Sequence, residues 1–281
     1  MTQLAVTGYA SLDYPVALSG RAEGNATTHI KWRSAEDWPR LGGCPAYVTA
    51  AAVSHGVTAS PVCWTGANRE GDLFVSALEK KGVSTAGVDR IEGERAPSAM
   101  LIYQSDGSCI CLYDPAFGGA ERLTDDQAEV VAEAENLCVT VGPGHLMDAI
   151  LAARNPQGRL SWVLKNDLNC FTPEICRRLS ADAEIIFCNR HERGLIAETR
   201  DDVLIVETQG AEGVVVERCG ERTEIAVEPV SALDTTGAGD TFAGGFLGAW
   251  NSGVDDPVEA ARCGIADVRT LLVERSGGKL A

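Results

Sequence analysis

The chain has 281 residues, of which 45% are hydrophobic, and its formal net charge at pH 7 is −16. This length and apolar content can bury one full core, whereas the strong negative charge argues against nucleic acid or an anionic membrane as a partner. No apolar run approaches the roughly 20 residues that span a bilayer, and the first residues lack a basic-then-apolar leader, so we expect a cytoplasmic protein.

The ten cysteines do not indicate a disulfide framework. The chain is long, shows no secretory feature and contains no C-x-x-C pair. We expect reduced, mostly buried thiols rather than a metal site.

The first segment, residues 4–13, begins as an apolar strand and is expected to end on a turn that carries Ser11 and Asp13. Ligands of open α/β sheets bind beyond the carboxyl ends of strands, so Asp13 is placed to accept hydrogen bonds from a polyol. The alternative is an aspartate that only forms the turn.

Residues 14–41 break the alternation of strands and helices. Short strands are expected around P-V-A-L and T-T-H-I-K-W, and a second pair at 98–104 and 108–114. Four β segments outside the main alternation predict a small separate sheet, built from about 14–41 and 97–115. The alternative is an ordinary edge hairpin.

Between these segments, Gly42 and Gly43 lead into a helix and allow the backbone to approach a ligand closely. A strand is expected at 57–64 and an amphipathic helix at 72–83, with Leu73, Phe74, Val75 and Leu78 facing inward. Thr124 and Gln127 have the spacing of a capping box.

From residue 137 onward the alternation is regular. Strands are expected at 137–141, 160–165 and 184–188, and a strand–turn–strand unit at 203–217. Thr172 with Pro173 and Asp256 with Pro257 mark helix starts.

A turn of small residues, Gly237 to Gly239, opens an apolar helix and leads directly into Asp240. Such a turn leaves amide groups unpaired at the positive end of the helix dipole, which suits an anion. A carboxylate there competes with the anion, unless Asp240 takes a proton from an attacking hydroxyl while the turn holds a phosphoryl group. The alternative is that Asp240 only caps the helix.

The nine residues D-T-T-G-A-G-D-T-F (234–242) resemble the C-terminal motif of the ribokinase-like (PfkB) family of carbohydrate and nucleoside kinases. The resemblance implies one α/β domain over 1–281, with a doubly wound, mainly parallel sheet flanked by helices and a small β-sheet lid. It also implies phosphoryl transfer from ATP to an alcohol. Asp240 would be the base, and Gly237, Ala238 and Gly239 the anion hole.

Further segments resemble family motifs. Asp13 matches an aspartate that contacts substrate hydroxyls, and Gly42 to Tyr47 matches the N-terminal motif. This sequence departs from that motif at Tyr47, where asparagine is common, and at Cys44, a position that is frequently polar or basic. The substrate-binding residues implied are Ser11, Asp13, Gly42, Gly43 and Tyr47.

The resemblance places the nucleotide near Asn189, Thr208 and Gly210 and implies that Glu192 holds water around Mg²⁺. Asp234 and Thr236, with the segment 275–281, match residues that hold a monovalent cation, here K⁺, in many relatives. His191 also looks like a ligand, but Mg²⁺ prefers oxygen and keeps most of its waters, which disfavours histidine. For Thr208 and Gly210 the alternative is a plain β-turn.

We therefore expect an ATP-dependent kinase of a small sugar or sugar-like alcohol, with a homodimer contact through the β lid. A nucleoside kinase of the same fold is the alternative, with Tyr47 and Trp32 as aromatic faces for a base. A non-catalytic ligand-binding relative is a third hypothesis.

Overall fold

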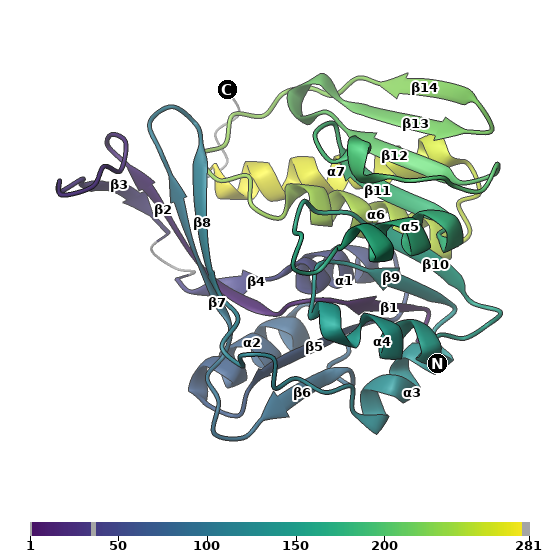
Figure 1. Cartoon of the computed structure of the whole chain (residues 1–281). Coiled ribbons are helices and arrows are strands. Elements are labelled where there is room, and N and C mark those ends of the chain that lie inside the picture. Colours follow the sequence, from purple (N-terminus) through teal and green to yellow (C-terminus); the bar gives the residue numbers. More distant parts are fainter. Residues whose placement is uncertain (1, 35–37, 277–281) are drawn as a thin grey trace.

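A computed structural model describes residues 2–34 and 38–276 (Figure 1). Within these residues a nine-stranded sheet has the order β14-β13-β12-β11-β10-β9-β1-β5-β6. Neighbouring strands from β12 to β6 run parallel, and β13 and β14 form an antiparallel edge. The bounds are β1 Leu4–Thr7, β5 Ala59–Gly66, β6 Val88–Ile91, β9 Asn136–Val139, β10 Arg159–Val163, β11 Ile185–Asn189, β12 Leu204–Thr208, β13 Val214–Arg218 and β14 Glu221–Ile225.

Helices cover both faces of this sheet (Figure 1). One buried apolar cluster joins the sheet to α3, α4 and α5, and two others join it to α1, α2, α6 and α7. The bounds are α1 Cys44–Val53, α2 Arg69–Lys80, α3 Asp125–Glu133, α4 Met147–Ala153, α5 Pro173–Asp182, α6 Ala238–Asn251 and α7 Pro257–Arg275. The doubly wound sheet expected from the sequence is therefore confirmed.

Helix α6 is held tightly in its layer. The Phe246 ring packs edge-on against Phe187 of β11, with ring centroids 5.2 Å apart. A Cβ on Gly244 would lie 2.3 Å from the Val48 carbonyl of α1, and one on Gly245 only 2.9 Å from Gly264 of α7. Such close backbone approach, together with the aromatic contact, fixes where the first turn of α6 sits relative to the sheet.

The lid is a second, smaller sheet that projects from the body beside the C-terminal end of α7 (Figure 1). Its strands are β2 Ser11–Leu18, β3 Ile30–Arg33, β4 Arg40–Gly42, β7 Ser98–Tyr103 and β8 Cys109–Asp114. They have the order β3-β2-β7-β8, and β4 pairs with β2 near its start. The separate sheet predicted from the two irregular segments is confirmed, with a start at Ser11 rather than about residue 14.

Several local expectations need correction. Ser11 and Asp13 lie in strand β2 rather than in a turn, because the connection after β1 is only three residues long, Gly8 to Ala10. On α2, Phe74 and Leu78 are buried but Leu73 is 47% exposed, since three consecutive apolar residues cannot share one helix face.

The edge strands β6 and β14 were not expected from the sequence. All ten cysteines are free thiols, of which half are buried.

Candidate active site

Asp240 lies in the first turn of α6, where the sequence placed it. Gly237 is the N-cap in the left-handed conformation, with φ of 72°, and a side chain there would be strained. The Ala238 amide donates to the Thr235 carbonyl at 3.1 Å. The amides of Gly239 and Asp240 have no carbonyl four residues back within the helix, so they are the donors that suit an anion.

Among the residues that the structure describes, Lys165 is the cation that forms an ion pair with this carboxylate, and the sequence did not single it out. It follows β10 at the carboxyl edge of the sheet, and its Nζ lies 3.2 Å from Asp240 Oδ1. The Lys165 side chain is 32% exposed and that of Asp240 only 8%. Burial alone would lower the pKa of Lys165, but the carboxylate charges of Asp240 and, further away, Glu192 outweigh burial and raise it. Lys165 therefore stays charged beside the turn.

Cys44 opens helix α1 in the same neighbourhood. Burial raises the pKa of its thiol well above the ordinary value, and the Asp240 carboxylate raises it further. The preceding Gly43 has φ of 89°, and a Cβ there would lie 2.3 Å from the Tyr9 carbonyl. The glycine pair thus brings the start of α1 against the end of β1 and places an uncharged thiol beside Asp240.

Asp13 forms the second centre of the site. Its side chain is 3% exposed, and Oδ1 accepts a hydrogen bond from the Ser11 hydroxyl at 2.7 Å. Burial raises the pKa of Asp13, while Ser11 and the charge of Arg40 act in the opposite direction. A Cβ on Gly42 would lie 2.1 Å from Asp13 Oδ1, so only glycine leaves room for this carboxylate.

Tyr47 joins the two centres. Its hydroxyl donates to Asp13 Oδ2 at 3.3 Å. Its ring faces the turn before Asp240, because a Cβ on Gly237 would lie 2.7 Å from three ring atoms. The structure therefore brings Ser11, Asp13, Gly42 and Tyr47 together with the turn that precedes Asp240.

The remaining motif residues line the carboxyl edge of β11 and β12. Asn189 and Thr208 are direct neighbours in the parallel register of these strands. Glu192 is 7% exposed and accepts a hydrogen bond from the Asn189 amide at 2.8 Å. Gly210 follows with a φ of 61°, and His191 is exposed. Asn189, Glu192, Thr208 and Gly210 thus gather at one edge of the sheet.

A model of the pfkB family carbohydrate kinases matches residues 1–268 of the chain. The chain belongs to this family. The PfkB kinase is 26% identical to a nucleoside kinase of Methanothermobacter thermautotrophicus, over 98% of this chain and 90% of that protein. It is 27% identical to a ribokinase of Haemophilus influenzae, over 74% of this chain and 73% of that one.

Its fold also matches that of a solved ribokinase from Arabidopsis thaliana complexed with ribose and ATP. The TM-score is 0.78 at 21% identity, with 97% of this chain and 93% of the other covered. The shared fold and the family membership together make this chain an ATP-dependent kinase.

Asp234 of the PfkB kinase lies in a buried polar cluster. Its Oδ2 accepts a hydrogen bond from Arg40, and its Oδ1 accepts one from the Tyr103 hydroxyl at 2.7 Å. Arg275 donates to the Thr236 carbonyl and lies 3.8 Å from Asp234 Oδ1. Burial alone would raise the pKa of Asp234, but Arg40, Arg275 and Tyr103 lower it to about 2.

Sequence reasoning missed Arg40 and Tyr103, because they carry no motif and reach Asp234 from distant parts of the chain. Arg275 begins a segment that the sequence did single out, but its guanidinium was not expected to approach Asp234. The segment 275–281 was expected to help hold a cation, and its residues from 277 onward lie outside the described ranges.

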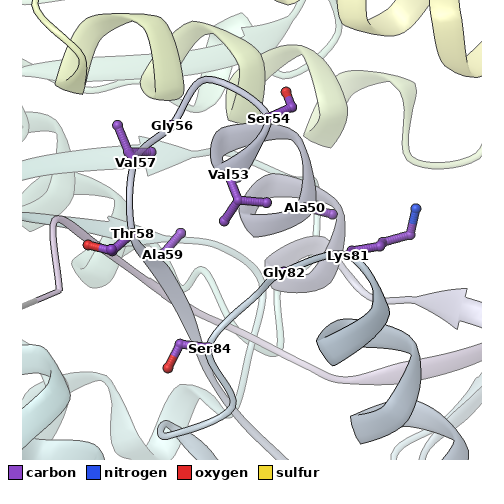
Figure 2. Close-up of a pocket in the computed structure, with 10 residues that line it drawn as sticks. All are labelled: Ala50, Val53, Ser54, Gly56, Val57, Thr58, Ala59, Lys81, Gly82 and Ser84. Atoms are coloured by element: carbon purple, nitrogen blue, oxygen red, sulfur yellow. The ribbon is translucent and has the colours of Figure 1, made fainter.

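A hollow of about 410 Å³ lies elsewhere on the PfkB kinase. Figure 2 shows the residues that line it. It is lined by the end of α1, the residues that lead into β5, and the segment after α2, which contributes Lys81. Because β5 begins at Ala59, the hollow lies at the amino edge of the sheet, opposite the edge where ligands of such sheets bind. It is separate from the site around Asp240.

Among the residues that the structure describes, no helix is both long and apolar enough to cross a membrane. Within the same ranges, no group of three or more His, Cys, Asp or Glu side chains is placed to hold a metal.

Proposed function

We propose that this kinase transfers the γ-phosphoryl group of ATP to a hydroxyl of a small sugar, with Asp240 as the general base. The observation that carries the proposal is the place of Asp240. It is the third residue of α6, beyond the left-handed Gly237, and Tyr47 bridges that turn to Asp13. A proton acceptor and an anion-binding turn thus stand next to a buried aspartate suited to hydroxyl groups.

In this mechanism Asp13, oriented by Ser11, accepts hydrogen bonds from the sugar, and the Gly42–Gly43 backbone and Tyr47 bound it. Asp240 takes the proton of the attacking hydroxyl as the oxygen–phosphorus bond forms. The bond from γ-phosphorus to the ADP oxygen breaks, and its electron pair leaves with ADP. The turn from Gly237 to Gly239, whose donors are the amides of Gly239 and Asp240, stabilises the charge on the phosphoryl group together with Lys165.

The nucleotide would bind along Asn189, Thr208 and Gly210, with its phosphates toward the α6 turn. A metal fits beside it, because Glu192 offers a buried carboxylate and Mg²⁺ needs few direct protein ligands. Glu192 would hold water around the ion, and bound Mg²⁺ neutralises phosphate charge. We also propose that the protein acts in the cytoplasm, where ATP is available.

Replacement of Asp240 by Asn tests the proposal. Turnover should fall about 10²–10⁴-fold while ATP affinity stays similar, because the amide cannot take the proton. The measurement is ADP release with a panel of sugars and nucleosides, together with titration of ATP by calorimetry. Asp148→Asn is the matched control, since that carboxylate is 88% exposed on α4. Unchanged turnover in Asp240→Asn would remove the base assignment.

A nucleoside acceptor is the second candidate, and one observation favours it. Tyr9 and Tyr113 form an aromatic pair with centroids 5.4 Å apart. Tyr113 lies on the same lid face as Asp13, because Ala99 pairs with both residues across the sheet. This pair suits a base better than Trp32, which packs against the lid's own apolar residues, or Tyr47, which is engaged by Asp13.

The same panel separates the hypotheses. Turnover only with nucleosides would favour the second candidate, and turnover with free sugars the first. Ligand binding without ATP turnover on any member would indicate a non-catalytic relative.

We further propose a homodimer through the lid. The outward lid face carries exposed apolar side chains, among them Met100 at 45% and Leu112 at 56% exposure. Such a face on an otherwise acidic protein suits a second copy of itself.

A further inference from the structure

The residues that the family resemblance assigns to a monovalent cation, Asp234 and Thr236, have oxygen atoms that already accept hydrogen bonds from two arginines and from neutral donors. Asp234 Oδ2 accepts from Arg40, and Oδ1 accepts from the Tyr103 hydroxyl and, at 3.0 Å, from the Thr236 amide. The Thr236 carbonyl accepts from Arg275. Each of these oxygens therefore faces a hydrogen-bond donor.

This donor set does not fit K⁺. The ion needs several oxygen lone pairs directed at it, and here two guanidinium groups point at the same oxygens. Asp234 is only 1% exposed, and Arg40 and Arg275 are 12% exposed each, so water screens the repulsion between an added ion and these groups poorly. A guanidinium stays charged at any physiological pH, so both arginines are permanent cations.

We propose that Arg40 and Arg275 replace a monovalent cation beside the anion-binding turn, so that nucleotide binding by this chain does not require K⁺. The inference rests on the proposed nucleotide site at Gly237 to Gly239. Asp234 and Thr236 immediately precede that turn, and Arg275 holds the Thr236 carbonyl. The two guanidinium groups thus supply, from within the chain, the positive charge that a bound ion would bring.

The two arginines come from different parts of the fold, and this links the lid to the body. Arg40 lies on β4 of the lid and Tyr103 on β7, whereas Arg275 ends α7. Arg40 is the cross-strand neighbour of Asp13 between β2 and β4. The same lid residue donates a hydrogen bond to Asp234. An internal cation on the lid therefore ties the lid to the catalytic turn, which a diffusible ion does not do.

The test compares KCl with choline chloride at equal ionic strength. Calorimetric titration of the wild-type chain with ADP and Mg²⁺ should give dissociation constants within about twofold of each other. Binding that is about tenfold tighter in KCl would overturn the inference. Failure to bind ADP in both salts would instead contradict the proposed function.

Thermal unfolding without nucleotide tests whether K⁺ binds, even if the chain fails to bind ADP in both salts. An ion that binds only the folded chain raises its melting temperature, so equal melting in the two salts supports internal replacement. A melting temperature higher in KCl by about 3 °C or more would overturn it.

A variant pair gives an independent readout. Arg275→Met should weaken ADP binding in choline chloride about fivefold or more, and KCl should restore part of that loss, because Thr236 and Asp234 oxygens become available. Arg269→Met, on the exposed side of α7 with 40% exposure, is the control and should match the wild type in both salts. Wild-type affinity of Arg275→Met in choline chloride would contradict the proposal.

Discussion

Lys165 illustrates how a single side chain adapts the family motif in this chain. Cys44 stands at a position that is frequently polar or basic in sugar kinases, and its thiol is neutral. Lys165 approaches Asp240 from the end of β10 and places a cation beside that thiol. In the proposed mechanism, the charge that stabilises the transferring phosphoryl group would thus come from the end of β10 rather than from the start of α1.

Lys165→Met tests this role. Turnover should fall about 10²–10³-fold, because a fixed cation beside the developing phosphoryl charge is lost, whereas ADP affinity should fall much less. Lys165→Arg should retain part of the activity. ADP release and calorimetry give the two quantities, and Lys80→Met, at the exposed end of α2, is the control. Equal losses in turnover and ADP affinity would show that Lys165 only holds the nucleotide.

At the scale of elements, the contact between β2 and β4 shapes the proposed acceptor site. Ser11 pairs with Gly42 and Asp13 with Arg40 across these short strands. Because the Asp13 carboxylate occupies the space beside Gly42, the position of Asp13 depends on strand β4.

Gly42→Ala should therefore raise the KM for the acceptor about tenfold or more with little change in ADP binding, because the new methyl displaces Asp13 from its position. Steady-state kinetics with the best acceptor of the panel measures the effect. Gly20→Ala is the control, since a Cβ at Gly20 meets no atom within 4 Å. An unchanged KM would mean that Asp13 does not contact the acceptor.

Elements whose ends depend on neighbouring residues were predictable from sequence. The capping box of Thr124 and Gln127 and the Thr172 cap occur as expected, because a few adjacent residues determine them. The Arg40–Asp234 pair was not predictable, because its partners are 194 positions apart and only the folded lid brings them together. The same holds for Tyr103, which is 131 positions from Asp234.

In the candidate site, too, some residues were predictable from the sequence and others were not. The motif itself indicated Asp240 and its turn, since neighbouring residues specify a small-residue helix start. Lys165 follows an unremarkable buried strand, and only the register of β9, β10 and β11 places it near Asp240. Contacts set by strand order cannot be read from a single sequence without the topology.

For the whole molecule, a net charge of −16 opposes the approach of an anionic nucleotide. Three cations offset this repulsion locally. Lys165 lies beside Asp240, and Arg40 and Arg275 contact Asp234 and Thr236, just before the turn at Gly237. Partly buried cations act strongly at short range, whereas the surface charge is screened beyond about 10 Å by salt. At the proposed site, the local placement of cations rather than the global charge would therefore govern nucleotide binding.

The outward face of the lid carries exposed apolar side chains. Tyr14, Met100 and Leu112 are cross-strand neighbours on β2, β7 and β8, so their side chains share the outward face. Ile30 on β3 adds a side chain that is 57% exposed. Burial of this face against the same face of a second copy would remove apolar surface from water.

The double variant Met100→Lys and Leu112→Lys tests that pairing. We expect the wild type to sediment as a dimer and the variant as a monomer, because opposed lysines on a self-complementary face repel each other and lose apolar contact. Analytical ultracentrifugation measures the mass, and near-native melting excludes unfolding. Leu73→Lys, on the exposed side of α2 with 47% exposure, is the control and should remain dimeric. A monomeric wild type, or a variant that stays dimeric, would contradict the lid as the interface.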